Sequence, residues 1–195
     1  IDGGLSTTYR ERIKKLPKPS GALVFYGALR RVDLPVDCPG HMQIFDENFG
    51  SLFISISMED DQRAPAGMAT LIASIFVDID QWSNLDSQSY ARKKNILSKQ
   101  IRTILNKKFD LLETSWDHQE LSTPRSFERW TGRPGGIVGG LGQHPDQFGP
   151  FGLSSRTPLT GLWLCGDSIY PGEGTAGVSQ SALMAVRQLL ESKGK

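Results

Sequence analysis

Short apolar runs separated by turn residues dominate the first part of this chain. The runs predict strands, and within residues 51–58 Ile54, Ile56 and Met58 alternate with Ser55 and Ser57 as in a half-buried strand. Because short polar turns separate the runs, we expect an antiparallel or mixed sheet. The predicted strands cover residues 21–29, 41–45, 51–58 and 69–77, and residues 5–19 are predicted to be a polar connector.

The pattern then changes to the three- and four-residue spacing of helices. Residues 89–112 place leucine, isoleucine and phenylalanine at that spacing with basic residues between them, which predicts an amphipathic helix. Thr123 and Pro124 suit a helix cap and a first helical turn, so we predict a short helix at 126–130. Residues 132–158 are rich in glycine and proline and are predicted to be a loop.

The last part of the chain combines a strand with a helix. Residues 162–165 form a short apolar run that stops at a Gly-Asp pair, which predicts a strand with Cys165 buried at its end. Apolar residues recur at helical spacing over 175–191, which predicts a long helix. Strands and helices together predict an α/β chain with a mixed sheet.

Composition and charge exclude several classes of protein. The 195 residues include 22 Lys and Arg against 21 Asp and Glu, a formal net charge of +1. This balance argues against sequence-independent nucleic-acid binding, which needs a basic surface. No apolar stretch approaches the roughly 18 residues that span a bilayer. The two cysteines form no CxxC pair, so a reducing compartment fits best and we expect a cytoplasmic protein.

The helix predicted at 89–112 has a basic outer face that allows two interpretations. We interpret its lysines and arginines as a solvated face above a sheet, because the apolar side lacks the bulky aromatics of an interfacial anchor. The alternative is a helix that contacts a membrane surface or an anionic partner, which would make the protein peripheral to a membrane.

The strongest chemical signal is a glycine-rich segment near the end of the sequence. Residues 172–177 read Gly-Glu-Gly-Thr-Ala-Gly, a literal GxGxxG. A dinucleotide fingerprint also needs a following helix, a second strand and an acid about 20 residues further on. Only 18 residues follow Gly177. We therefore interpret the segment as a turn that lets a cofactor approach the backbone, followed by a helix N-terminus that offers N–H groups to negative charge.

A Gly-Asp pair adds a second element just before this turn. Gly166 would admit a ligand close to the main chain, and the Asp167 carboxylate can accept hydrogen bonds from sugar or ribityl hydroxyls. The alternative is that Asp167 caps a local turn. His41, His118 and His144 lack the spacing of metal ligands, so we predict no metal site.

These features together resemble a known family. Residues 162–168 (LWLCGDS) and 171–179 (PGEGTAGVS) resemble the C-terminal flavin motif of the carotenoid desaturase and carotene isomerase family, which belongs to the amine-oxidase-like FAD oxidoreductases. Residues 125–140 resemble the loop that precedes this motif in the family. The resemblance is strongest over residues 123–190.

The resemblance implies an FAD site and an apolar polyene substrate. Asp167 would hold the ribityl chain, and the N–H groups of Gly177 and Val178 would face the pyrimidine edge of the flavin. Phe127 and Trp130 are candidates for lining a polyene tunnel, the alternative being core packing. No catalytic side chain is assigned, because the flavin itself takes the hydride. The other predicted cofactor-binding residues are Gly166, Gly174 and Thr175.

The resemblance also implies a domain organisation. Residues 1–131 would form part of a mixed-sheet substrate-binding lobe, and residues 132–195 the closing strand and helix of an FAD-binding domain. Nothing in residues 1–53 supplies the glycine fingerprint for the ADP half of FAD. We therefore interpret the chain as the C-terminal part of a longer enzyme, inactive in isolation.

The expected activity of that enzyme is desaturation of a carotenoid by hydride transfer to FAD. One alternative is an FAD-dependent carotene cis–trans isomerase or another flavoenzyme of the amine-oxidase type. An alternative of another class is a non-catalytic lobe that binds an apolar ligand or a partner chain. An isolated lobe would expose surface that favours association, so homodimerisation is also expected.

Overall fold

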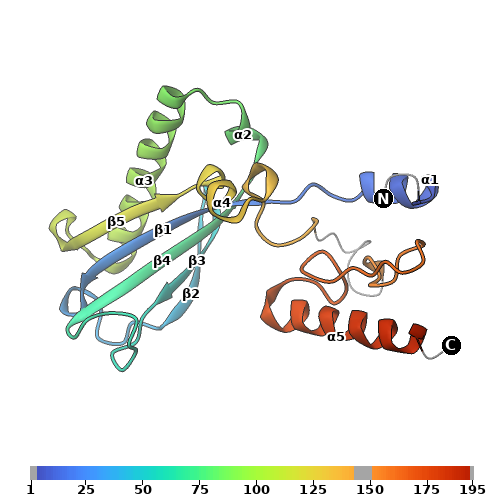
Figure 1. The fold of residues 1–195 in the computed structure, drawn as a ribbon. Coiled ribbons are helices and arrows are strands. Elements are labelled where there is room, and N and C mark those ends of the chain that lie inside the picture. The colour runs from blue at the N-terminus through green and yellow to red at the C-terminus, as the bar shows by residue number, and fades with distance from the viewer. Residues whose placement is uncertain (1–3, 143–150, 194–195) are drawn as a thin grey trace. The chain divides into compact units, whose positions relative to one another are not determined.

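A computed structural model describes residues 4–142 and 151–193 of the chain (Figure 1). The chain divides into two compact units. One unit is Gly21–Ile137, and the other joins the segment before Gly21 to the segment after Ile137. Each unit has its own architecture.

Five strands form one sheet in the Gly21–Ile137 unit, in the order β2-β3-β4-β1-β5. Strand β1 pairs with β4 over ten residues, and β5 forms the edge beside it. Every ladder is antiparallel, so the predicted α/β class is confirmed while the sheet is antiparallel rather than mixed. The strands are β1 (Gly21–Arg30), β2 (His41–Asp46), β3 (Gly50–Ile56), β4 (Met68–Val77) and β5 (Trp116–Ser122).

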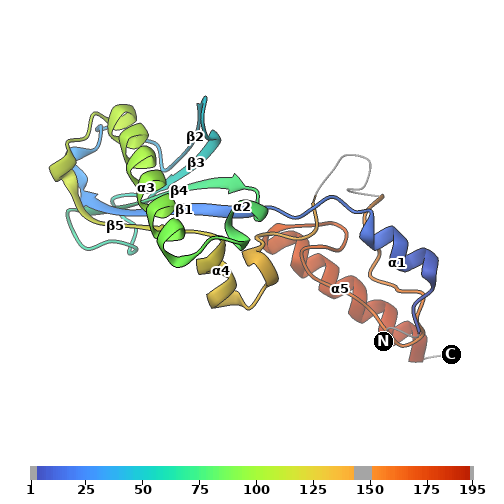
Figure 2. The same cartoon turned by 90° about the horizontal axis from the view of Figure 1, so that it is seen from above.

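Helix α3 (Ser87–Phe109) covers one face of this sheet, as Figure 2 shows. Leu23 and Phe25 of β1 and Ile101 and Leu105 of α3 belong to one core cluster and are at most 1% exposed. Each such side chain stabilises the fold by about 1.5–3 kcal/mol relative to an exposed position. The predicted amphipathic helix is therefore confirmed, and its apolar stripe packs on the sheet.

Helix α4 (Pro124–Thr131) confirms the predicted short helix and begins at Pro124, two residues before the predicted range of 126–130. Thr123 is its N-cap, and the Thr123 amide donates to Ser126 Oγ at 3.1 Å in a capping box. Gly132 ends the helix at φ 69°, a left-handed conformation that glycine adopts without strain. The remaining short elements of this unit are α2 (Asp80–Ser83) and the 3-10 turns Arg31–Asp33, Glu113–Ser115 and Pro134–Gly136.

In the other unit, the connector predicted over residues 5–19 contains a helix, α1 (Thr7–Lys14). Ser6 caps it by accepting a hydrogen bond from the Tyr9 amide at 3.3 Å. None of its residues is buried, so the sequence carries no apolar stripe that would have revealed it.

Helix α5 (Gly174–Lys193) confirms the helix predicted near the end of the chain. The strand predicted at residues 162–165 is wrong, because only an isolated bridge between Trp163 and Arg156 occurs there. The Ser155 hydroxyl donates to the Leu164 carbonyl at 2.8 Å, so a side chain takes the acceptor that a neighbouring strand would use. Over the residues that the structure describes, no helix combines the length and apolar character needed to cross a bilayer.

Candidate cofactor site

The turn before α5 depends on glycines with positive φ. Gly166, Gly172 and Gly174 have φ values of 121°, 118° and 82°, a region that other residues enter only with strain. Open space surrounds the position that a Cβ atom would take at Gly166 and at Gly174. At these two positions glycine is therefore needed for the backbone conformation, and it leaves the main chain accessible to a bound ligand.

Packing within the protein accounts for the presence of glycine at position 177. A Cβ atom at Gly177 would lie 2.4 Å from the carbonyl oxygen of Gly172, far inside van der Waals contact. The first turn of α5 thus lies directly against the glycine turn that precedes it. Any larger residue at position 177 would push the helix away from this turn.

Ser181 joins the Gly166 turn to the second turn of α5. The Gly166 amide donates to Ser181 Oγ at 2.9 Å, and the Ser181 hydroxyl donates to the Val178 carbonyl at 2.8 Å. Ser181 is completely buried. Ser181 lies two residues after the PGEGTAGVS stretch, and its role was missed, because nothing in the pattern tells a buried serine from an exposed one.

A glycine pair from the preceding loop completes the region. The Gly140 amide donates to the Glu173 carboxylate at 3.2 Å, and the Leu141 amide donates to Ser168 Oγ at 3.1 Å. A Cβ atom at Gly140 would lie 2.5 Å from the backbone of Asp167. The loop therefore packs closely on the turn that carries Asp167.

Asp167 is half-buried beside this loop. The oxygen atoms Ser168 Oγ and Asp167 Oδ1 lie 3.4 Å apart, at the long limit of a hydrogen bond. Gly174 and Thr175 at the start of α5 are exposed, and Gly177 is partly exposed. All the residues predicted to bind a cofactor thus belong to the same compact unit, where Ser181 links Gly166 to α5.

The donor and acceptor groups of this region fit the ribityl and pyrimidine part of a flavin. The first four N–H groups of a helix have no partner within it, and the first turn of α5 contains no acidic residue. The N-terminus of α5 can therefore stabilise negative charge or donate to carbonyl oxygens. The Asp167 carboxylate provides acceptors for hydroxyl groups. The open positions at Gly166 and Gly174 leave room for such a group.

Phe127 and Trp130, the predicted substrate-binding residues, lie on α4 in the other unit. Phe127 is half-buried, and Trp130 is 80% exposed with the Arg129 guanidinium 5.4 Å from the centre of a Trp130 ring. Core packing, the alternative considered for both residues, does not account for Trp130. Their role in substrate binding stays a prediction.

Among the residues that the structure describes, the cysteines and histidines supply no further site. Cys165 is exposed, so its predicted burial is wrong, because residues 162–165 do not form a buried strand. Burial raises the pKa of the Cys38 thiol, which therefore stays protonated near neutral pH. His144 lies outside the described residues. Within residues 4–142 and 151–193 no group of three His, Cys, Asp or Glu side chains could hold a metal ion.

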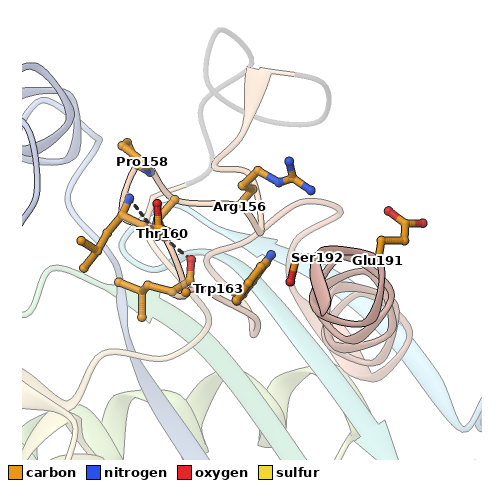
Figure 3. Close-up of a pocket in the computed structure, with 10 residues that line it drawn as sticks. Arg156, Pro158, Thr160, Trp163, Glu191 and Ser192 are labelled. Carbon is orange, nitrogen blue, oxygen red and sulfur yellow. Dashed lines mark hydrogen bonds between the residues drawn. The ribbon is translucent and has the colours of Figure 1, made fainter. Parts of the chain in front are cut away.

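A cavity of about 770 Å³ lies at the other end of α5, shown in Figure 3. Residues 156–163 line it together with Glu191 and Ser192 from the last helical turns. The cavity therefore lies at the C-terminal end of α5, whereas Gly174 and Thr175 begin that helix, which is about 30 Å long. Its lining residue Trp163 precedes Gly166 by three residues.

Comparison with curated proteins identifies relatives of the chain. It is 29% identical over 171 residues to the chloroplastic prolycopene isomerase of Daucus carota, covering 83% of this chain and 28% of that protein. It is 30% identical over 171 residues to prolycopene isomerase 2 of an Oncidium hybrid cultivar, covering 83% of this chain and 29% of that protein. For the Arabidopsis thaliana prolycopene isomerase, the identity is 30% over 152 residues, 76% of this chain and 25% of that protein.

No family model matches the chain. The chain spans less than a third of the length of these relatives. The aligned part nevertheless includes most of this chain. The chain is therefore a distant homologue of the prolycopene isomerases, which confirms the resemblance to the carotenoid desaturase and carotene isomerase family.

Proposed function

We propose that this chain is part of an FAD-dependent enzyme that isomerises double bonds of a carotenoid. The observation that carries the proposal is the glycine turn with Asp167 at the N-terminus of α5, in a chain related to prolycopene isomerases. Desaturation, the activity first expected from the sequence, uses the same flavin motif. The names of the relatives favour isomerisation.

In this proposal the unit that contains α5 contributes to the flavin site. Asp167 accepts hydrogen bonds from the ribityl hydroxyls, and the amides of Gly177 and Val178 at the start of α5 face the pyrimidine edge. When bound, the flavin supplies reversible electron or hydride transfer. Because a helix N-terminus favours negative charge, α5 stabilises the electron-rich form of a group bound there.

The Gly21–Ile137 unit is proposed to be part of the substrate-binding lobe. Its sheet carries aromatic residues on the face opposite α3, because they alternate along the strands with core residues. Tyr26, Phe53 and Phe76 are exposed on that face. A hollow of about 330 Å³ lies beside Tyr26 and Ile72. Exposed apolar surface of this kind suits a polyene or a covering chain.

The rest of the FAD site is proposed to lie in a longer protein, because the relatives are more than three times as long as the aligned segment. The isolated chain is then expected to bind no stoichiometric FAD and to be inactive. The relatives named above are chloroplastic, whereas the sequence alone led us to expect a cytoplasmic protein.

The test is an assay of the full-length protein that contains this chain, supplied with prolycopene in two parallel reactions: one with reduced FAD and no oxygen, and one with oxidised FAD and an added electron acceptor, which desaturation requires. An isomerase gives a product of unchanged mass and altered retention, whereas a desaturase gives a product that has lost two hydrogen atoms for each new double bond. A product that has lost hydrogen would show that the enzyme is a desaturase and would refute the proposed isomerase activity. Absence of both products, with FAD bound, would refute carotenoid chemistry.

A further inference from the structure

Helix α3 is strongly positively charged, although the net charge of the whole chain is close to zero. Of its 23 residues, seven are Lys or Arg and none is Asp or Glu. Outside α3 the chain contains 15 basic and 21 acidic residues. The net charge of the chain is therefore near zero although α3 itself is strongly basic. Net charge alone therefore understates how this surface attracts anions.

Two of the seven basic side chains are engaged within the unit. Lys93 Nζ donates to the Gln81 carbonyl at 2.9 Å and lies 4.6 Å from the centre of a Trp82 ring. Arg102 forms an ion pair with Glu113 at 2.8 Å. Among the described residues, the other five have no ion pair or hydrogen-bond partner for the charged group: Arg92, Lys94, Lys99, Lys107 and Lys108.

Three of these five lie in one line along the solvent side of α3. Arg92, Lys99 and Lys107 are spaced by seven and eight residues, which is close to two helical turns, and all three are exposed. Ile96 lies between Arg92 and Lys99 on the same side and is 48% exposed. We call Arg92, Ile96, Lys99 and Lys107 the basic stripe. It extends over about 22 Å of helix.

The basic stripe combines its charges with an apolar hollow. A hollow of about 270 Å³ is lined by Arg92, Lys93, Ile96, Leu97 and Ser89, and most of its surface is apolar. Unpaired cations are too costly to bury in a protein core, so this face suits water or an anionic partner. The hollow beside the cations adds a site for a hydrocarbon group.

We propose that the basic stripe of α3 docks on the surface of an anionic lipid bilayer. Lipid phosphates neutralise Arg92, Lys99 and Lys107, and Ile96 enters the boundary between headgroups and acyl chains. A nucleic acid or an acidic peptide would use the same charges but would gain little from an exposed isoleucine. The proposal does not rest on flavin binding or on carotenoid chemistry.

The experiment measures co-sedimentation of the 195-residue chain with two kinds of vesicle. One is pure phosphatidylcholine, and the other contains about one third phosphatidylglycerol, which gives a negative surface potential. We expect binding to the anionic vesicles alone, and its loss in about 1 M salt, where the Debye length falls to about 3 Å. Equal binding to both vesicles, or no binding to either, would overturn the proposal.

Matched charge variants locate the docking surface. Arg92→Gln, Lys99→Gln and Lys107→Gln combined should weaken binding to anionic vesicles by about a hundredfold, since each cation contributes about fivefold. The control combines Arg10→Gln, Lys15→Gln and Arg187→Gln, which removes the same charge from exposed positions outside α3. The control should change binding by less than about threefold. Equal losses in the two variants would refute the assignment to α3.

The Ile96→Ser variant distinguishes binding to a bilayer from binding to a soluble polyanion. It should weaken vesicle binding by about fivefold, because a half-exposed isoleucine no longer enters the boundary region, and should leave binding to heparin unchanged. If heparin binds more tightly than the vesicles and Ile96→Ser affects neither, the stripe recognises a soluble polyanion and the membrane proposal fails.

Discussion

At the scale of single residues, the candidate cofactor site depends on one buried serine. Ser181 accepts a hydrogen bond from the Gly166 amide, 15 residues earlier in the sequence, and donates one to the Val178 carbonyl, so it links the turn to helix α5. Removing its hydroxyl would leave the Gly166 amide without this acceptor. An unsatisfied donor of this kind costs about 1–3 kcal/mol.

Ser181→Ala should therefore loosen the Gly166 turn. We expect the amide hydrogens of residues 164–168 to exchange about ten- to a hundredfold faster, measured by hydrogen-exchange mass spectrometry. Ser179→Ala is the control, because Ser179 is exposed on the same helix. Unchanged exchange in Ser181→Ala would mean that the serine does not hold the turn.

Asp167 is the residue whose cofactor role is most directly testable. In the full-length protein, Asp167→Ala should remove a charge-assisted hydrogen bond of roughly 1.5–3 kcal/mol and weaken FAD affinity by about ten- to a hundredfold. Flavin fluorescence measures the affinity, and melting of the apo form measures stability. A turn-capping Asp167 would give the reverse: a lower apo melting temperature with unchanged FAD affinity.

At the scale of elements, helix α3 is delimited by residues at its two ends. Asp86 Oδ1 accepts hydrogen bonds from the amides of Gln88 and Ser89, both at 2.9 Å, and Asp110 ends the helix in the left-handed conformation. The Ser89 hydroxyl also donates to Asp86. The hydrogen bonds from Ser89 hold the pKa of Asp86 below its ordinary value of 3.8.

The stability of α3 should therefore depend on pH in the acid range. A carboxyl whose pKa is lowered on folding stabilises the fold above its unfolded pKa, and this contribution is lost as the pH falls through the folded pKa. We expect melting temperatures to fall below about pH 4, and to fall less steeply in Asp86→Asn, which keeps a capping acceptor but does not titrate. Identical pH profiles for the two chains would contradict this role of Asp86.

The elements that the sequence predicts are those whose apolar residues recur at the period of a strand or a helix, or whose start carries a cap followed by proline. Strands β1 to β4 and helices α3 and α5 have such signals, and Thr123 with Pro124 marks α4. Strand β5 was missed because Leu121 is its one fully buried residue, as fits an edge strand. The prediction of a strand at residues 162–165 was wrong, because an apolar run does not show whether a neighbouring strand is present to pair with it.

The candidate site could be predicted in part. The glycines and Asp167 follow from composition and order, since a turn with positive φ before a helix needs glycine. The packing of Gly140 on Asp167 and the hydrogen bonds of Ser181 could not be predicted. These contacts join segments that are 15 to 27 residues apart, and their geometry is set by the fold.

At the scale of the whole molecule, the hydrophobic core is distributed unequally between the two units. The core cluster of 17 buried residues belongs entirely to the Gly21–Ile137 unit. In the described part of the other unit, Leu153 and Ile169 are the buried hydrophobic residues. Helix α5 there leaves a row of apolar side chains exposed: Leu183, Val186 and Leu190. The association with another chain that the sequence led us to expect stays a prediction.

This imbalance predicts that the two units differ in resistance to proteolysis. The Gly21–Ile137 unit buries a continuous core, whereas the other unit gains little hydrophobic stabilisation and should open more often. We expect brief trypsin digestion to cut first at exposed sites such as Lys15 and Arg187, and to leave a fragment that contains β1 to β5 and α3. Mass spectrometry of the fragments identifies the sites. Helix α3 contains seven Lys or Arg residues at which trypsin can cut. Early cuts at these residues would show that this unit is no more stable than the other.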